Sequence, residues 1–479
     1  MAVTFSKKAL QERLVGKTLY EVPTPSIVLD LAKLEVNCQR MIDAAEKNGI
    51  GWRAHIKTHK VNMTVELTRL QVGDDLTTPA NIIVSTLLEA ERITPLLQEF
   101  QSKGRKVNVL YAFPLYPSVI SRLAAVSNAL GPDSLSVLLD HPDQVPLLAT
   151  LKAQSGGHKP LVFLKIDVQS HRAGAIPGTT AYQSLLRAVL ASEAEGSSVL
   201  HGLYAHAGQS YYTREDWAAL SYLTEEYSVL RRVADDVRGT SPGHALVLSV
   251  GATPTATALQ HPDIVGVPAA AGRPDTGDEQ ARARVASLSA LIRTLKGDGL
   301  DLEVHAGVYP TLDLQQLATH ARDRSLLRSN DIGVTVVADV ASLYEGRGEG
   351  GSTEALVNAG SLALGREPCK EEAPGHYNGW GVVTPWGDAE LEKTDPAPRE
   401  FPAVHGGWQV GRISQEHGIL VWKGAKEEYV PLKFGQRVRI WPNHSCIAGA
   451  GYDHYLVVDS RRQGAEDEVI DVWERWNGW

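Results

Sequence analysis

The chain has 479 residues, of which 43% are apolar and 22% charged, and its net charge is −9 from 47 basic and 56 acidic side chains. This ordinary globular composition excludes a disordered chain, and the length predicts two or three domains. A mildly acidic chain lacks the basic surface that binds nucleic acids or anionic membranes. The longest apolar runs, such as residues 245–250, are far too short to span a bilayer. We therefore expect neither nucleic acid nor membrane as a partner.

Cysteine usage and the N-terminal segment both favour a cytoplasmic protein. The three cysteines, Cys38, Cys369 and Cys446, lie far apart and do not form a disulfide framework. The first twenty residues contain no apolar stretch followed by a small-residue cleavage site, as a secretory signal would. We expect a reduced protein in the cytoplasm.

Short apolar segments rich in β-branched residues recur along the first two thirds of the chain, with helix-like stretches between them. Many are apolar at nearly every position, as expected of parallel strands covered on both faces. Over residues 21–330 this rhythm predicts an α/β fold, a (β/α)8 TIM-type barrel rather than one doubly wound sheet. The predicted strands are 26–29, 52–57, 81–85, 107–112, 135–139, 161–167, 200–206, 246–250 and 302–306.

The composition changes after about residue 330. Eight of the 10 tryptophans lie at or beyond Trp380, and short strand-like segments such as 418–423 and 437–441 are separated by glycine and proline. Residues 331–479 are therefore predicted to form a second, β-rich domain, with which residues 1–20 are expected to pack. Within the barrel region, residues 269–299 are predicted to be an inserted helix with a polar lead-in.

The segment RAHIKTHK, residues 53–60, follows the start of a predicted strand. On a strand, His55, Lys57 and His59 share one face, and in a barrel the C-terminal strand ends project into the active site. A lysine held there beside other cations, partly desolvated, has a lowered pKa and attacks carbonyl carbons. A solvated basic surface explains the octet equally well, so both explanations stay open on these residues alone.

Together with Thr24-Pro-Ser and the amphipathic helix that follows, this octet resembles the start of pyridoxal-phosphate enzymes of the alanine-racemase barrel class, fold type III. More narrowly, it is similar to the eukaryotic D-serine dehydratases and the related D-threonine aldolases. In that family the first lysine of the run is joined covalently to the cofactor, and it corresponds to Lys57 rather than Lys60. The resemblance runs from Thr24 to Asp459, with residues 269–299 unmatched.

Further cofactor contacts are implied by the same resemblance. Tyr204 and His206 lie at the end of the predicted strand 200–206, and Tyr211 follows it. On sequence grounds alone, a tyrosine and a histidine that close the barrel core would be the simpler explanation. The resemblance instead makes all three residues cofactor contacts. Arg172 either meets the cofactor near its ring nitrogen or forms an ion pair with Asp167, and the two readings are equally good.

Two glycine turns after strands are candidates for phosphate binding. Such turns let the backbone approach a phosphate closely, and phosphate sites of these barrels use the loops after the last strands. The resemblance assigns this role to the Thr253 side chain and to the backbone of Gly307 and Val308. Val308 stands where many relatives are expected to have a polar residue, a change that a backbone N–H contact survives.

The second domain contains the motif Pro442-Asn-His444-Ser-Cys446. Imidazole and thiolate are good zinc ligands, although a chance His-x-Cys is common. The motif resembles the zinc site of D-serine dehydratases, whereas the aldolases tend to have an acidic residue at the position of Cys446. The resemblance thus implies Zn²⁺ on His444 and Cys446, with positions left open for water or substrate.

The implied activity is the pyridoxal-phosphate- and zinc-dependent conversion of D-serine, a small molecule, to pyruvate and ammonia. An aldolase acting on D-threonine or 3-hydroxyaspartate is the alternative within enzymes. A non-catalytic protein that binds the same cofactor is the alternative from another class, although such barrels lack a metal-bearing second domain. Enzymes of this kind tend to be homodimers, which we also expect here.

Overall fold

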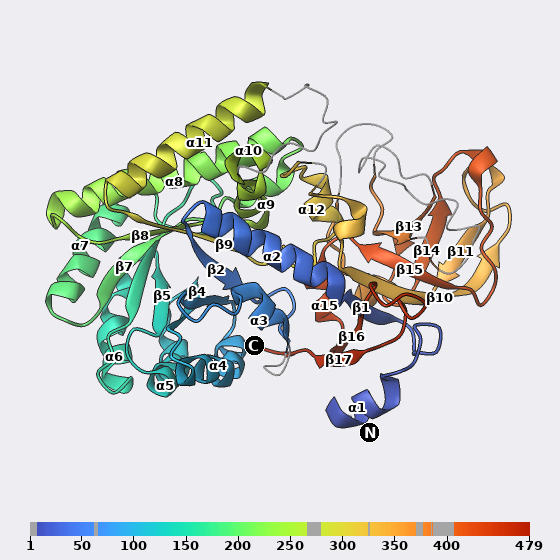
Figure 1. The fold of residues 1–479 in the computed structure, drawn as a ribbon, viewed down its shortest axis with the longest axis horizontal. Helices are drawn as coiled ribbons and strands as arrows, with labels where there is room; N and C mark the ends of the chain where they lie inside the picture. The colour runs from blue at the N-terminus through green and yellow to red at the C-terminus, as the bar shows by residue number, and fades with distance from the viewer. Residues whose placement is uncertain are drawn as a thin grey trace. The chain divides into compact units, whose positions relative to one another are not determined.

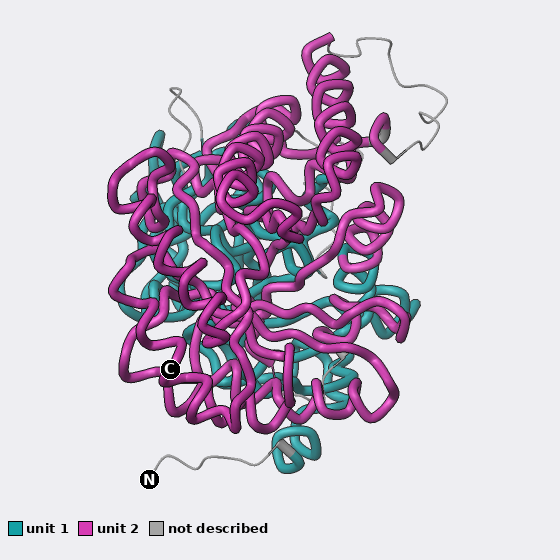
Figure 2. Tube along the Cα trace, turned by 90° about the vertical axis from the view of Figure 1, so that its left-hand side faces the viewer, with its two compact units in different colours: residues 1–37, 308–318, 324–477 teal, residues 38–307, 319–323, 478–479 magenta. Residues whose placement is uncertain are grey.

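The computed structural model describes residues 7–61, 66–265, 279–323, 326–369, 377–384, 386 and 407–479. The chain folds into two compact units (Figure 2). We call residues 38–307, 319–323 and 478–479 the barrel unit, and residues 1–37, 308–318 and 324–477 the sheet unit. The chain therefore passes between the units several times. The sequence prediction differs, because it places all of residues 21–330 in the barrel and residues 331–479, with residues 1–20, in the second domain.

The barrel unit contains a closed barrel of parallel strands, β2 to β9, in which β9 pairs with β2 (Figure 1). This confirms the predicted fold class. The strands are β2 (Gly51–His55), β3 (Ala80–Val84), β4 (Val107–Pro114), β5 (Leu135–Leu139), β6 (Leu161–Lys165), β7 (Val199–Tyr204), β8 (Val247–Val250) and β9 (Asp301–Ala306).

Most barrel strands are buried on both faces, which explains their nearly continuous apolar sequences. In β5, for example, every residue of LSVLL is buried. Ile83, Leu110, Leu138, Phe163 and Tyr204, from five neighbouring strands, pack together as a core cluster. The main helices of this region are α2 (Leu31–Lys47), α3 (Glu66–Val72), α4 (Leu87–Ser102), α5 (Ile120–Leu130), α6 (Pro146–Gln154), α7 (Thr180–Ala194), α8 (Asp216–Thr240), α9 (Thr253–Thr257) and α10 (Pro262–Val265).

The insertion predicted at residues 269–299 contains the expected helix, α11 (Glu279–Gly297). Its buried residues recur every three or four positions, as on one face of an amphipathic helix: Ala281, Val285, Leu288, Ile292 and Leu295. This helix packs beside α8 on the outside of the barrel (Figure 1). The predicted polar lead-in, residues 269–278, lies outside the described residues.

The sheet unit is built on a nine-stranded sheet of order β11-β14-β13-β12-β15-β10-β1-β16-β17. Its strands are β1 (Ser26–Asp30), β10 (Val334–Tyr344), β11 (Glu354–Val357), β12 (Gly381–Thr384), β13 (Trp408–Ile413), β14 (Gly418–Trp422), β15 (Arg437–Pro442), β16 (His454–Val458) and β17 (Asp471–Glu474). Short helices α12 (Leu314–Ala318), α13 (Ser361–Leu364) and α15 (Ser445–Ala450) accompany them.

The placement of β1 corrects the sequence prediction. Residues 26–29 do form a strand, but the strand is not part of the barrel. It pairs antiparallel with β10, Ser26 opposite Val337, and parallel with β16, Val28 opposite Leu456. An apolar strand buried on both faces has the same sequence signature in either sheet, so its pattern alone could not identify its partners.

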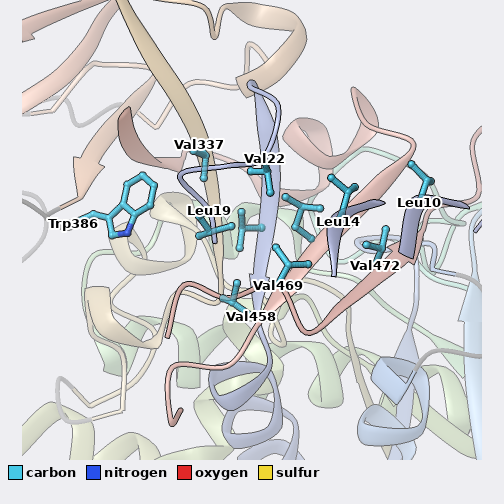
Figure 3. Close-up of a cluster of buried hydrophobic side chains, with 11 residues drawn as sticks. Leu10, Leu14, Leu19, Val22, Val337, Trp386, Val458, Val469 and Val472 are labelled. Atoms are coloured by element: carbon cyan, nitrogen blue, oxygen red, sulfur yellow. The ribbon is translucent and has the colours of Figure 1, made fainter. Parts of the chain in front are cut away.

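The N-terminal residues also belong to the sheet unit. Helix α1 (Lys7–Leu14) lies against β17, and Leu10 and Leu14 join a buried cluster with Val469 and Val472 (Figure 3). A β-bridge between Thr18 and Glu468 continues this contact along the chain. Across the described ranges, none of the helices combines the length and apolar character that crossing a bilayer needs.

Candidate functional site

A cavity of about 150 Å³ opens at the C-terminal ends of the barrel strands. This is the end at which barrels of this type carry their active sites. Each contributing strand or following loop supplies only one to three side chains to the wall. The lining residues are His55, Lys57, Ser85, Ala112, Lys165, Arg172, Tyr204, His206, Tyr211, Gly251, Ala252, Thr253, His305, Ala306 and Gly307.

The two lysines of the octet at residues 53–60 lie in different environments. Lys57 lines the cavity, whereas Lys60 forms an ion pair with Glu89, Nζ to Oε1 3.0 Å, and its side chain is mostly buried. An ammonium held by a buried carboxylate is not available as a nucleophile. The geometry therefore favours Lys57 over Lys60 as the reactive amine.

The predicted shared face of the octet is only partly present. Strand β2 ends at His55, and residues 57–59 form a turn. His55 and Lys57 both reach the cavity, but His59 is buried elsewhere, its Nε2 2.8 Å from Oε1 of Gln71. The strand periodicity used for the prediction does not extend through the turn.

Two glycines bring backbone to the cavity wall. Gly251 has φ +144°, and a Cβ built on it would lie 2.2 Å from the carbonyl oxygen of His305. At Gly307 a Cβ would lie 3.4 Å from Cε of Lys57. Thr253, which is buried, follows Gly251 on the wall, so two of the three residues expected at the phosphate, Thr253 and Gly307, line this cavity. Val308 is buried but is not among the lining residues.

Aromatic side chains form one wall of the cavity. The rings of Tyr204 and His305 stack with centroids 4.3 Å apart and planes 12° apart. The ring of His206 is nearly parallel to that of His305, at 6.4 Å, and its Nδ1 is 2.7 Å from the Gly251 carbonyl oxygen. Tyr211 lies in the turn that follows. Such a wall suits a planar ring.

The charged lining residues are all cationic: Lys57, Lys165 and Arg172. Burial and then the Arg172 charge lower the pKa of Lys165 to about 8, and its Nζ lies 4.8 Å from the Tyr204 ring centroid. A cavity with three cations, no carboxylate, a glycine-rich wall and parallel rings fits a planar cofactor that carries a phosphate dianion. The residues present therefore fit pyridoxal phosphate.

The sequence leaves open whether Arg172 meets the cofactor or forms an ion pair with Asp167, and the hydrogen bonds of Asp167 bear on this choice. Its carboxylate accepts hydrogen bonds from the His171 backbone N–H, at 3.0 Å, and from His171 Nδ1, at 2.8 Å. The partner of Asp167 is thus the residue before Arg172. Arg172 lines the cavity, as its predicted cofactor role requires.

Four polar lining residues were not predicted as site residues: His55, Ser85, Lys165 and His305. Lys165 carried a usable signal, because it is the single charged residue of the buried strand LVFLK. His305 carried a similar one at the end of β9, DLEVHA. Ser85 carried none, since a serine after a strand is ordinary. It lies 3.2 Å from Nε2 of His55.

In the sheet unit, His444 and Cys446 lie where β15 gives way to α15. His444 is extended and Cys446 is helical, which differs from the extended segment that the sequence suggests. The residues beside them are firmly held. The Asn443 amide donates to the Glu367 and Gly379 carbonyls, at 3.0 and 2.9 Å, and the Ser445 N–H donates to Asp313, at 2.9 Å.

The donor set at these two residues fits a zinc ion. Nδ1 of His444 is buried without a hydrogen-bond partner. Burial lowers the pKa of His444, but the neighbouring Cys446 sulfur opposes this effect, and the resulting pKa is raised to about 9. A metal ion bound by the imidazole and the thiolate would take the place of this direct interaction between the two side chains. Within the described part of the chain, no cluster of three or more His, Cys, Asp or Glu side chains is arranged to hold a metal.

Comparison with known proteins gives one consistent result. Residues 333–458 match the family described as "Putative serine dehydratase domain". The D-serine dehydratase of Schizosaccharomyces pombe is 34% identical, with 99% of this chain and 96% of that protein aligned. The enzyme of the same name from Saccharomyces cerevisiae is 30% identical over 97% and 98%.

Solved structures extend the likeness. Two mutants of a D-threo-3-hydroxyaspartate dehydratase, an enzyme known from Delftia sp. HT23, match with TM-scores of 0.68. One is a histidine-to-alanine mutant, 25% identical, which covers 97% of each chain. The other is a cysteine-to-alanine mutant in the metal-free form, 26% identical over 97% of this chain and 100% of that one.

Proposed function

Because the chain belongs to the D-serine dehydratase family, we propose that it is a lyase that converts D-serine to pyruvate and ammonia with pyridoxal phosphate and Zn²⁺. The observation that carries the proposal is the cationic cavity at the strand ends, which holds Lys57 and excludes Lys60. A non-catalytic role is disfavoured, because two relatives that align along nearly the full chain are named as dehydratases.

Each cavity residue has a task in this proposal. Lys57 would hold the cofactor through its Nζ, and in the reaction the same amine would take the α-proton of the substrate. Thr253 and the backbone N–H groups of Gly307 and Val308 hold the phosphate. The bound cofactor withdraws electrons from the substrate α-carbon.

The remaining contacts orient the ring. Tyr204 and His206, whose rings belong to the aromatic wall, would pack against the cofactor ring. Tyr211 and Arg172 would donate hydrogen bonds to the cofactor. Lys165, a buried cation beside Tyr204, adds to the positive charge that attracts a phosphate and a substrate carboxylate.

The metal addresses the difficult part of the reaction, because hydroxide is a poor leaving group. We assign Zn²⁺ to His444 and Cys446, which would hold the ion, and the bound ion would supply Lewis acidity toward the substrate hydroxyl. The dehydratase mutants support this assignment, since a histidine and a cysteine two positions apart were replaced and the cysteine mutant is metal-free. The hydroxyl leaves as water, and hydrolysis of the remaining enamine gives pyruvate and ammonia.

The test is a pyruvate assay with D-serine on the holoenzyme, repeated after chelation and after addition of zinc. We expect turnover that chelation abolishes and zinc restores. Full turnover by metal-free protein would remove the zinc step, and absence of pyruvate under every condition would overturn the proposed activity.

Aldol cleavage is separated from dehydration by its product. With D-threonine or 3-hydroxyaspartate, an aldolase releases glycine, whereas a dehydratase releases ammonia and an oxo acid. We expect ammonia from hydroxy amino acids and no glycine. A homodimer and a cytoplasmic location are kept as further proposals, the first to be tested by light scattering of the full chain and the second by imaging of the tagged protein.

A further inference from the structure

A chain of buried polar groups runs through the barrel interior to the cavity. Oε1 of Glu303 accepts hydrogen bonds from Nε of Arg53 and from Oγ of Ser249, both at 2.7 Å. Oγ of Ser249 also lies 3.1 Å from Nδ1 of His305. Arg53, Glu303, Ser249 and His305 are all almost completely buried. The last of them lines the cavity.

These contacts determine where the proton of His305 resides. The Glu303 carboxylate forms an ion pair with Arg53 and only accepts hydrogen bonds, so Ser249 must donate its single proton to it. The serine oxygen can then only accept from His305, which places the imidazole proton on Nδ1. Burial, followed by the charges of Lys165, Arg53 and Lys57, lowers the pKa of His305 well below its ordinary value. Burial and these neighbouring cations therefore favour the neutral imidazole.

Nε2 of His305 consequently carries no proton and can act only as a hydrogen-bond acceptor. It is buried and has no hydrogen-bond partner among the described residues. A buried polar atom without a partner costs free energy, and binding a donor would recover that cost. A phosphate or carboxylate oxygen cannot satisfy it, because neither carries a proton.

We infer that His305 is a cofactor- or substrate-binding residue whose Nε2 accepts a hydrogen bond from an N–H or O–H group of the bound molecule, and that Ser249 and Glu303 are positioning residues that keep this nitrogen unprotonated. The inference rests on the proposed function only for the identity of the bound molecule.

The test uses the full chain labelled with ¹⁵N-histidine, with the His305 signal identified by its loss in His305→Gln. We expect a neutral ring protonated on Nδ1 in the cofactor-free protein. Adding pyridoxal phosphate should shift the Nε2 signal in the direction of an accepted hydrogen bond. In Ser249→Ala the preference for Nδ1 should disappear, and the dissociation constant for pyridoxal phosphate should rise about tenfold, as loss of one buried hydrogen bond predicts.

Ser136→Ala is the matched control. Its hydroxyl donates to Asn108 in the same interior network, at 2.9 Å, but is not bonded to His305. We expect its cofactor affinity to stay within about twofold of the parent. Equal weakening in both serine variants, a proton on Nε2, or an Nε2 signal unmoved by bound cofactor would overturn the inference. Failure of the parent protein to bind pyridoxal phosphate would instead overturn the proposed function.

Discussion

The cavity of the barrel unit and the His444–Cys446 pair of the sheet unit are built in opposite ways. The cavity gathers side chains from seven strands or the loops after them, and hydrogen bonds or ring stacking hold several of them in place. The other region offers two ligands on adjoining elements, pinned by Asn443 and Ser445. In the proposed function, the cavity would surround its ligand, whereas the His444–Cys446 pair would supply only part of a coordination shell.

This difference predicts different roles and different stability of binding. A ligand held from many sides and by a covalent bond is a permanent part of the enzyme. An ion held by two side chains keeps open positions, so it can bind a substrate hydroxyl and can also be removed by chelators. The predictions that follow test this contrast, beginning with the largest effect.

Replacing the reactive amine should have the largest effect. Lys57→Arg keeps the charge but removes the nucleophile and base, so we expect turnover of D-serine to fall by at least about 10³-fold. Lys60→Arg is the matched control, because arginine can retain the ion pair with Glu89. Steady-state pyruvate formation measures both. A comparable loss in the two variants would contradict the division of roles between the lysines.

Removing a metal ligand should affect turnover without affecting the cofactor. We expect Cys446→Ala to lower kcat for D-serine by about 10²- to 10³-fold, since Lewis-acid assistance contributes several kcal/mol. Titration with pyridoxal phosphate should give the parental affinity. Cys369→Ala, which removes the other cysteine of the sheet unit, serves as control and should retain turnover and zinc content. Parental zinc content in Cys446→Ala would refute the ligand assignment.

Adding a methyl group at Gly251 should damage the cavity. Its positive φ and the 2.2 Å approach of a Cβ to the His305 carbonyl force the backbone to move. We expect Gly251→Ala to lose about 3 kcal/mol of stability and most of its cofactor affinity. Gly239→Ala, in helix α8 with open space around the new methyl, should instead gain about 0.5–1 kcal/mol. Thermal unfolding measures both, and equal Tm shifts would show that the cavity backbone is not constrained.

Stability should depend on pH through Glu226. Its buried carboxyl accepts from the N–H groups of Ala207 and Gly251, and burial raises its pKa to about 7. A carboxyl with a raised folded-state pKa binds more protons when folded, so its contribution to stability falls as pH rises from about 4.5 to 7. We expect Glu226→Gln to lack this fall and to exceed the parent by about 3 kcal/mol at pH 8.

Unfolding measured at several pH values tests this expectation. The matched control is Glu225→Gln, the preceding residue, whose carboxylate accepts from Gln169 in an exposed contact. This variant should follow the parental trend with pH. A Glu226→Gln protein that is less stable than the parent at pH 8 would show that the charged carboxylate supports the loops after β7 and β8.

The sequence alone predicted the barrel because its strands are short, apolar and regularly spaced, and burial on both faces requires that pattern. It misassigned β1, whose partners β10 and β16 lie about 300 residues or more away along the chain. Among site residues, Lys57 could be singled out by resemblance. The acceptor nitrogen of His305 could not, because its state depends on Ser249 and Glu303, which meet it only in the folded barrel.

The central claim is that the Lys57 amine carries the cofactor. Borohydride reduction of the holoenzyme, followed by digestion and mass spectrometry, would locate the attached cofactor directly. We expect the label on Lys57 alone. A label on Lys60 or Lys165, or reduced protein without any label, would contradict the claim.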